Sequence, residues 1–285
     1  GTISDIVPLV DENRVIVKLG LKLVEQTKNL GLKAILEASG YSKIDSNTIS
    51  FGVAPRINAC GRMGHQEEAL KLFLSKDGEE VQELTQKLNE YNRLRQETEK
   101  QIYNESIIQI EEKDLADRNT IVVMGKGWHH GVIGIVSSRI TELYFKPSIL
   151  LCEEEDYGKG SGRSIPGFDL YEALTQCKDT IDKFGGHSMA VGINVKKEKF
   201  EEFKEKLEKI AKEKHTEEIV PILKIDALIN LDEINKEMVE SLKELEPFGE
   251  ANKMPLFAFK NLKIDSIRAL SEGKHLKLTL KDDRN

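Results

Sequence analysis

The stretch TIVVMGKGWHHGVIGIVSSRITELYFKPSILLC, residues 120–152, carries the pattern that decides the fold. Thr120 to Met124 is a short apolar run, typical of a buried strand, and Gly131 to Tyr144 has apolar residues at helical spacing. Ser148 to Cys152 is a second apolar run and predicts another strand. The order strand, helix, strand favours an α/β domain.

The same alternation continues toward the C-terminus. We expect a helix at Tyr171 to Cys177, a strand at Ala190 to Val195 and a helix at Lys199 to Glu213. The predicted α/β domain therefore covers residues 118–214.

The N-terminal part of the chain is predicted to be helical. Apolar residues recur at helical spacing from Asn13 to Glu37 and are interrupted by Gly31, which indicates two short helices, followed by a loop at 51–64. Residues 66–113 lack proline and are rich in Glu, Lys, Gln and Leu, so we expect a long, solvated helix that connects two lobes, with a break near 75–78. A coiled coil is the alternative, but the heptads are irregular.

The last region is predicted to form part of a small β-barrel. Strands are expected at 222–229, 258–267 and 275–280, with a helix around 235–245. The first nine residues read as the end of a strand and its loop, so both ends of the chain look cut from a longer polypeptide.

Composition narrows the classes of function. The 285 residues carry a net charge of −7, so a nucleic-acid-binding role has to rest on local sites. Neither a membrane span nor a secretory leader is recognisable, which predicts a cytoplasmic protein. Cys60, Cys152 and Cys177 lie too far apart to indicate a zinc site or a disulfide framework.

Two glycine-rich stretches, Gly160 to Ser164 and Gly185 to Gly192, are the strongest candidates for a binding site. Glycines permit positive φ and close approach of a ligand, so that successive N–H groups can point at one anion. Ser161 and Ser164 add hydroxyl donors, and Arg163 offers a planar fork suited to phosphate. The stretches therefore predict a phosphate cradle; tight turns with a solvated arginine are the alternative.

Other residues leave two interpretations open. His187 either donates to a phosphate or nucleobase or caps a turn. Arg56 and Arg62 either clamp a nucleic-acid backbone or are solvated. Asp5 is either a helix cap or a metal ligand.

The segment around Trp128 opens a helix whose N–H groups could face an anion. Trp128 is more readily explained by core packing than by stacking on a base. A metal at His129 and His130 is disfavoured, because neighbours on a loop point in different directions.

Five motifs together resemble the RecJ-type exonucleases of the DHH phosphoesterase superfamily. In chain order they are GTISDIVPL, FGVAPRINACGRMG, WHHGVIGIVSSRI, GSGRSIPGFDLYEAL and FGGHSMAVG. The resemblance implies the C-terminal part of a DHH domain at 1–65, a connecting helix at 66–117, a DHHA1 domain at 118–214 and a partial OB-fold at 215–285. The DHH and DHHA1 domains are expected to face each other across the active-site cleft.

The resemblance also implies an activity, which is metal-dependent hydrolysis of single-stranded DNA from the 5′ end in DNA repair and recombination. Asp5 would be a ligand for Mn²⁺ or Mg²⁺, but the Asp-His-His triplet of the family does not occur in this sequence. We therefore expect no complete catalytic set and no nuclease activity from this chain alone. The expected partners are single-stranded DNA with a 5′-phosphate and other repair proteins, and the expected state is a monomer.

The substrate-binding residues implied by the resemblance coincide with those selected above. They are Ser161, Arg163, Ser164, Gly185, Gly186, His187, Arg56 and Arg62. Ala251 and Lys253 stand where family members commonly have glycine and proline, so that turn is expected to differ. Two alternatives are a DHH/DHHA1 phosphodiesterase for short RNA or cyclic dinucleotides and a non-catalytic single-strand-binding module.

Overall fold

A computed structural model describes residues 1–214, 220–273 and 275–282 and divides the chain into two compact units. The larger unit contains residues 27–41 and 51–221, and the smaller one contains 1–26, 42–50 and 222–285. The predicted boundary at 214/215 borders residues 215–219, which lie outside the described residues.

A five-stranded mixed sheet forms the centre of the larger unit. Its strands follow the order β1 (Ile121–Lys126), β2 (Ser148–Glu153), β3 (Tyr157–Arg163), β5 (Ala190–Lys196) and β4 (Lys183–His187). β1 and β2 are parallel, and the other neighbours are antiparallel.

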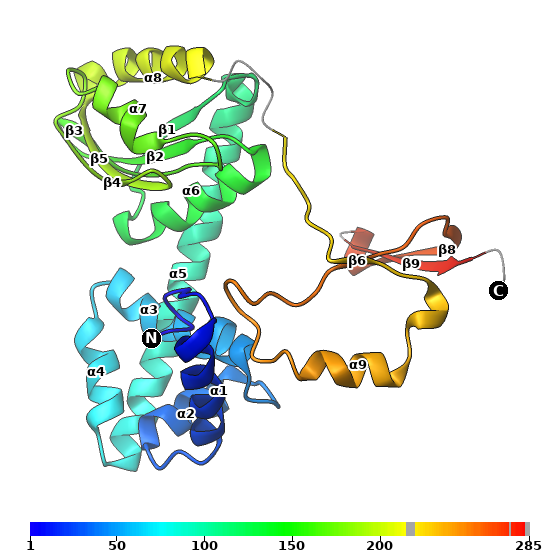
Figure 1. Cartoon of the computed structure of the whole chain (residues 1–285). Helices are drawn as coiled ribbons and strands as arrows, with labels where there is room; N and C mark the ends of the chain where they lie inside the picture. The colour runs from blue at the N-terminus through cyan, green and yellow to red at the C-terminus, as the bar shows by residue number, and fades with distance from the viewer. Residues whose placement is uncertain (215–219, 274, 283–285) are drawn as a thin grey trace. The chain divides into compact units, whose positions relative to one another are not determined.

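Helices cover this sheet on both faces (Figure 1). α6 (His130–Tyr144) and α5 (Gly78–Glu112) pack on one face, and α7 (Leu170–Gln176) and α8 (Phe200–Lys214) pack on the other. Alternation along the buried strands supplies both cores: Val122 faces α7 and α8, whereas Val123 faces α5 and α6. The predicted α/β class is confirmed, and six predicted elements of this domain agree with the structure to within two residues.

β3 and β4 were not predicted, since their glycines read as turns. Gly160 and Gly162 have no positive φ and lie within a regular strand. A Cβ on Gly160 would come 2.8 Å from Leu151 Cγ, and one on Gly162 would come 2.8 Å from Val191 Cγ2. Glycine is needed in β3 because core side chains press on the strand.

Shorter helices complete the larger unit: α2 (Leu30–Ser39), α3 (Ala54–Arg62) and α4 (Gln66–Leu74). The predicted loop at 51–64 is wrong, because η1 (Thr48–Val53) and α3 occupy these residues. Pro55 lies in the first turn of α3, where its missing N–H has no helical acceptor to lose. Gly31 does not interrupt a helix but lies inside α2, where a Cβ would come 2.0 Å from the Leu72 carbonyl oxygen.

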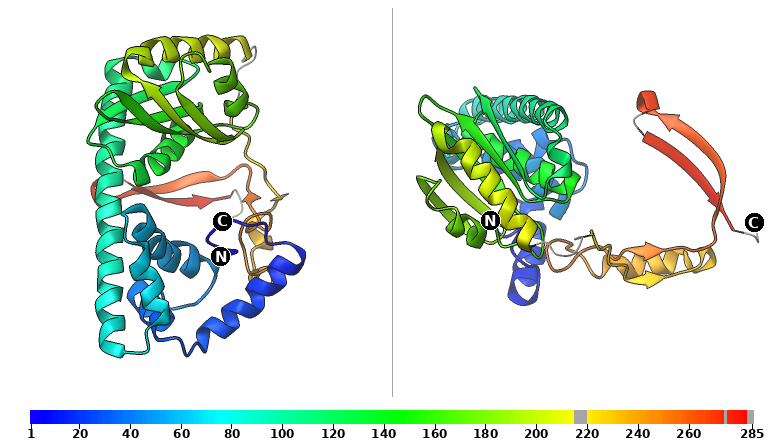
Figure 2. Two further views of the ribbon diagram at one scale, coloured as in Figure 1. Left: turned by 90° about the vertical axis from the view of Figure 1, so that its left-hand side faces the viewer. Right: turned by 90° about the horizontal axis from the view of Figure 1, so that it is seen from above.

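The predicted break near 75–78 is confirmed, but it separates two helices rather than kinking one. α5 starts after Asp77, whose side chain accepts a hydrogen bond from the Glu79 N–H at 2.9 Å. From there α5 runs for 35 residues, and its C-terminal part lies beside the sheet (Figure 2). Short 3₁₀ turns are η2 (Leu115–Asp117), η3 (Lys197–Lys199), η4 (Leu231–Glu233) and η5 (Ser271–Gly273).

The smaller unit contains α1 (Asp11–Glu25), α9 (Lys236–Lys243) and two open sheets. β6 (Ala227–Leu228) pairs with β7 (Phe257–Ala258), and β8 (Lys263–Leu270) pairs with β9 (His275–Lys281). Among the residues that the structure describes, both sheets are open. Three details were wrong: the strand predicted at 222–229 shrinks to β6, the one predicted at 258–267 is divided between β7 and β8, and residues 2–6 form a turn instead of a strand end.

Candidate functional site

Ser161 and Arg163 lie two residues apart on β3 and so point to the same face of the sheet. Arg163 Nη1 donates to Ser161 Oγ at 3.1 Å and to the Gly162 carbonyl oxygen at 2.8 Å. α6 approaches this pair closely at Gly134, where a Cβ would come 3.0 Å from Ser161 Oγ. The arginine is thus held half-buried at the edge of α6 with donors to spare.

Arg62 reaches the same place from the last turn of α3. Its Nη1 donates to the Gly131 carbonyl oxygen in the first turn of α6 at 2.9 Å. Partial burial is the main cause that lowers the pKa of Arg163, and the positive charge of Arg62 lowers it further. Since both guanidiniums stay protonated, this mutual repulsion is relieved when an anion lies between them.

Two further arginines, which the sequence did not single out, extend this group of guanidiniums. Arg95 on α5 donates to Glu99 at 2.6 Å, and Arg139 on α6 donates to the same carboxylate at 3.0 Å. The Arg139 guanidinium lies 4.0 Å from the centre of the Tyr103 ring. Loss of hydration lowers the pKa of Arg62, and Arg95 lowers it further, while Glu99 acts in the opposite sense.

Only folding could reveal this cluster, because the residues come from four elements. Arg95 and Arg139 bond one carboxylate, that of Glu99, which also acts on Arg62, while Arg163 interacts with Arg62; the four guanidiniums create a local positive field in a chain whose net charge is −7. We call Arg62, Arg95, Arg139 and Arg163 the arginine cluster.

The predicted glycines and His187 continue the same face of the sheet. Strand register places Ser161 opposite Gly192, and Gly192 opposite Gly185. In the next row Arg163 is opposite Ala190, which in turn is opposite His187. A Cβ on Gly185 or Gly192 would meet nothing within 4 Å, so the backbone there forms an open floor. His187 accepts a hydrogen bond from the Met189 N–H through Nδ1, at 3.3 Å.

Ser164 and Gly186 serve the turn beside this floor. The Ser164 hydroxyl is buried and donates to the Phe168 carbonyl oxygen at 2.7 Å. Gly186 has a φ of +137°, and a Cβ on it would come 2.2 Å from the Ala190 carbonyl oxygen. We therefore assign both residues to the geometry of the site rather than to ligand contact.

Arg56 lies apart from the arginine cluster. Its Nε donates to Asn89 Oδ1 at 2.6 Å, and its terminal nitrogens donate to the carbonyl oxygens of Gly52 and Ala38. A guanidinium held by three protein acceptors ties α2, α3 and α5 together, and we leave it out of the candidate site.

The histidines and the tryptophan of the α6 entrance are also held by protein groups. Trp128 is buried and donates from Nε1 to Glu105 at 2.6 Å, as core packing predicts. His129 caps α6 by accepting from the Gly131 N–H, whereas His130 bonds Glu154 at 2.6 Å. The two imidazoles thus have separate partners.

Asp5 belongs to the smaller unit, where it is exposed in a turn and its N–H donates to the Gly1 carbonyl oxygen at 2.9 Å. Across residues 1–214, 220–273 and 275–282, no three His, Cys, Asp or Glu side chains gather in a way that could hold a metal ion. Mn²⁺ and Mg²⁺ need several oxygen ligands, so the described residues do not form the metal site that the resemblance implies.

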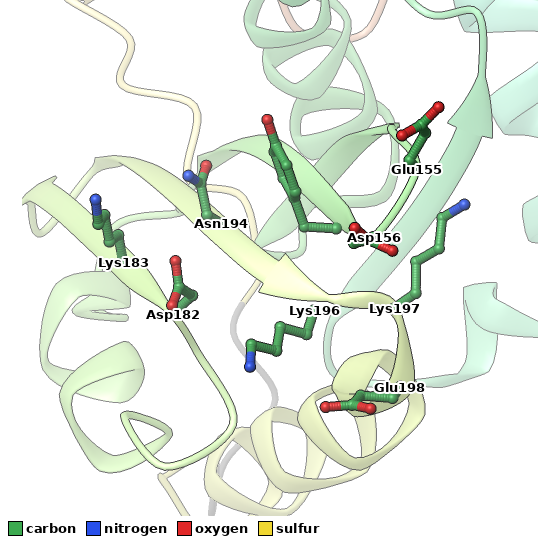
Figure 3. Close-up of a pocket in the computed structure, with 9 residues that line it drawn as sticks. Glu155, Asp156, Asp182, Lys183, Asn194, Lys196, Lys197 and Glu198 are labelled. Carbon is green, nitrogen blue, oxygen red and sulfur yellow. The ribbon is translucent and has the colours of Figure 1, made fainter.

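A hollow of about 740 Å³ lies at the ends of β3, β4 and β5 that are farther from Arg163 (Figure 3). Its walls mix carboxylates with lysines, among them Asp156, Asp182, Lys183 and Lys196. Because this lining has no dominant sign of charge, the arginine cluster is the better candidate for binding an anion.

Comparisons with known proteins relate the chain to RecJ proteins. The family model for the DHHA1 domain matches residues 117–213, and that for the RecJ OB domain matches residues 225–285. The single-stranded-DNA-specific exonuclease RecJ of Bacillus subtilis is 37% identical over 99% of this chain and 37% of its own length.

Solved structures show the same relationship. The crystal structure of RecJ from Thermus thermophilus in complex with Mg²⁺ has a TM-score of 0.87 at 34% identity, covering 98% of this chain and 43% of that one. The Mn²⁺ complex has a TM-score of 0.88 at 33% identity, covering 98% and 41%. The chain thus spans less than half the length of these relatives.

Proposed function

We propose, because the chain belongs to the RecJ family of single-stranded-DNA-specific exonucleases, that it grips the 5′-phosphate of a DNA strand for hydrolysis by the whole protein. The match to the RecJ OB domain over residues 225–285 favours this assignment over the smaller DHH/DHHA1 phosphodiesterases, which usually end earlier. A single-strand-specific end grip is therefore the contribution of this chain.

The observation that carries the proposal is the convergence of Arg163, Ser161 and Arg62 beside α6. A terminal phosphate accepts charge-assisted hydrogen bonds from both guanidiniums, and the Ser161 hydroxyl adds a donor. The glycine floor at Gly185 and Gly192 leaves room for the terminal nucleotide, and His187 lies at its border. A duplex end would bring a second backbone onto the same floor.

We assign no hydrolytic step to the described residues, because a divalent metal site cannot be assembled around Asp5 alone. Their part is to fix the end of the strand. Holding one phosphate in place sets which phosphodiester is presented for cleavage. The cytoplasmic location, the monomeric state and the repair partners remain predictions.

Binding of 3′-labelled oligothymidylate, with and without a 5′-phosphate, tests the end grip. The chain should prefer the phosphorylated end by about tenfold, as expected for hydrogen bonds to a charged group. Arg163→Ala should abolish that preference and leave the binding of the unphosphorylated strand nearly unchanged.

Arg118→Ala is the matched control, since Arg118 pairs with Glu205 outside the arginine cluster. It removes the same charge and should preserve the preference. Equal preference in the wild-type chain and Arg163→Ala would contradict the proposal.

A further inference from the structure

We propose that a second phosphate-binding subsite, formed by Lys159, Lys183 and Asn194, lies next to the first on the same face of the sheet. This inference rests on the proposed function and extends it. It concerns a phosphate of the same ligand, adjacent to the one that Arg163 holds.

Strand register places these three residues in one row across the sheet. Lys159 on β3 is opposite Asn194 on β5, and Asn194 is opposite Lys183 on β4. Directly opposed residues point to the same face, and Lys159 is two residues from Ser161, so the row lies on the face of Arg163, roughly 7 Å along the strand from Ser161. Figure 3 shows Lys183 and Asn194 side by side.

The charge of this face favours anions. The residues of β3, β5 and β4 that share it include none with an acidic side chain: Tyr157, Lys159, Ser161, Arg163, Ala190, Gly192, Asn194, Lys196, Lys183, Gly185 and His187. Lys159 and Lys183 are exposed, and no salt bridge between described residues involves either of them. Both ammonium groups are therefore available to a ligand.

The carboxylates near the row belong to residues that flank the strands rather than to β3, β4 or β5. Glu154 is held by His130 and Tyr157, which lower its pKa more than Lys159 does. Asp156 and Asp182 line the hollow at the ends of the strands, which Lys183 and Asn194 of the row line as well. These two carboxylates limit the positive surface on the side away from Arg163.

The floor between the two rows is bare backbone. Gly192 and Gly185, which lie in the row of Ser161, are exposed and separate the Arg163 row from the lysine row. A ligand bound by Arg163 can therefore continue along the sheet without meeting a side chain, while lysines on both flanking strands reach toward it. Half-buried Asn194 adds an amide donor in the centre of the row.

Two ligands present a second phosphate beside the first: a 5′-polyphosphate end and the next phosphodiester of the strand. Three probes separate them, namely thymidine 5′-monophosphate, thymidine 5′-triphosphate and the dinucleotide pTpT. Their dissociation constants are measured by NMR titration of the whole chain at fixed salt with EDTA. The wild-type chain should bind at least one of the two larger probes about tenfold more tightly than the monophosphate.

The double substitution Lys159→Gln and Lys183→Gln should remove that gain and leave monophosphate binding unchanged. Lys209→Gln with Lys212→Gln on α8 makes the same change of charge away from the sheet face and should preserve the gain. Loss for the triphosphate alone identifies a polyphosphate end, and loss for pTpT alone identifies the next phosphodiester.

Unchanged binding of both larger probes in the double variant would overturn the subsite, as would an equal loss for the monophosphate, which indicates only a general electrostatic effect. Arg163→Ala keeps the two proposals distinct. If Arg163→Ala leaves monophosphate binding intact, the proposed end grip is wrong. The subsite is tested separately, by the double lysine variant alone.

Discussion

Gly162 and Gly192 lie on neighbouring strands and have opposite surroundings. A Cβ on Gly162 would come 2.8 Å from Val191 Cγ2 and 3.0 Å from Ile149 Cγ1, inside the core. A Cβ on Gly192 would meet nothing within 4 Å. One glycine is thus required by packing, and the other leaves space that a ligand can use.

Gly162→Ala should therefore destabilise the chain by about 1–3 kcal/mol, because the added methyl overpacks the core. Gly192→Val should leave the free energy of unfolding nearly unchanged, since valine suits an exposed strand, but should weaken binding of 5′-phosphorylated DNA by covering the floor. Urea unfolding and the binding assay check both. A stable Gly162→Ala variant would mean that the two sides of β3 are wrongly assigned.

Ala251 is a second residue whose backbone conformation affects the free energy of unfolding. It takes a φ of +56° in the turn that Gly249 and Asn252 close with hydrogen bonds of 2.9 and 3.2 Å. Family members commonly have glycine here, and the left-handed region favours glycine. Alanine thus takes a backbone conformation here that glycine would adopt without strain.

Ala251→Gly should stabilise the smaller unit by about 1 kcal/mol, because the steric strain of a Cβ in the left-handed region is relieved. Thermal unfolding is the measurement. Ala258→Gly, in β7, is the control and should destabilise, since no positive φ is required there. A loss of stability in Ala251→Gly would show that the turn is not strained.

At the scale of elements, the apolar strands and amphipathic helices followed from periodicity, whereas β3, β4 and α3 did not. Glycine-rich β3 has no apolar alternation, because backbone rather than side chain fills its core face. α3 has a proline in its first turn and reads as a loop. The conformations of β3 and α3 therefore depend on the residues that pack against them.

The junction of α8 with β1 depends on one carboxylate. Glu208 accepts hydrogen bonds from the N–H groups and side chains of Asn119 and Thr120 at 2.8–3.0 Å. Burial alone would raise the pKa of Glu208, but these bonds hold it below its ordinary value of 4.5. A depressed pKa means stability that is present above the unfolded-state value and is lost as the pH falls through the folded-state value.

Glu208→Gln should thus destabilise the chain by about 2 kcal/mol at pH 7, the range for hydrogen bonds to charged groups. The difference from the wild type should shrink as the pH falls below about 4.5. Denaturant unfolding at pH 7 and pH 4 measures both. Glu205→Gln on the same helix should have little effect, since its partner Arg118 is solvent-accessible. A pH-independent difference would contradict the assigned role.

At the scale of the whole molecule, the chain separates into two units that contain different candidate functional residues. The larger unit contains the arginine cluster and the glycine floor, and Asp5 belongs to the smaller one. No helix in the described part of the chain has the length and apolar character that crossing a bilayer requires. The candidate phosphate-binding residues and Asp5 thus belong to different units.

We predict that the chain alone does not degrade 5′-phosphorylated single-stranded DNA with Mg²⁺ or Mn²⁺, because the described residues assemble no cluster of metal ligands. Gel analysis of a 3′-labelled oligonucleotide, with a RecJ protein of full length as positive control, is the measurement. Metal-dependent degradation by the chain would refute this, provided that Asp5→Ala abolishes it.

The sequence alone determined the α/β class, the break at 75–77, the family and the identity of Ser161 and Arg163 as candidates, because periodicity and motifs are local. Tertiary structure alone decided that the glycines form strands, that Arg56 bonds three protein acceptors and that Arg95 and Arg139 join Arg62. Their guanidiniums come from separate helices, and charges distant in sequence interact only when packing brings them together. The lysine row likewise follows from register, which no single strand encodes.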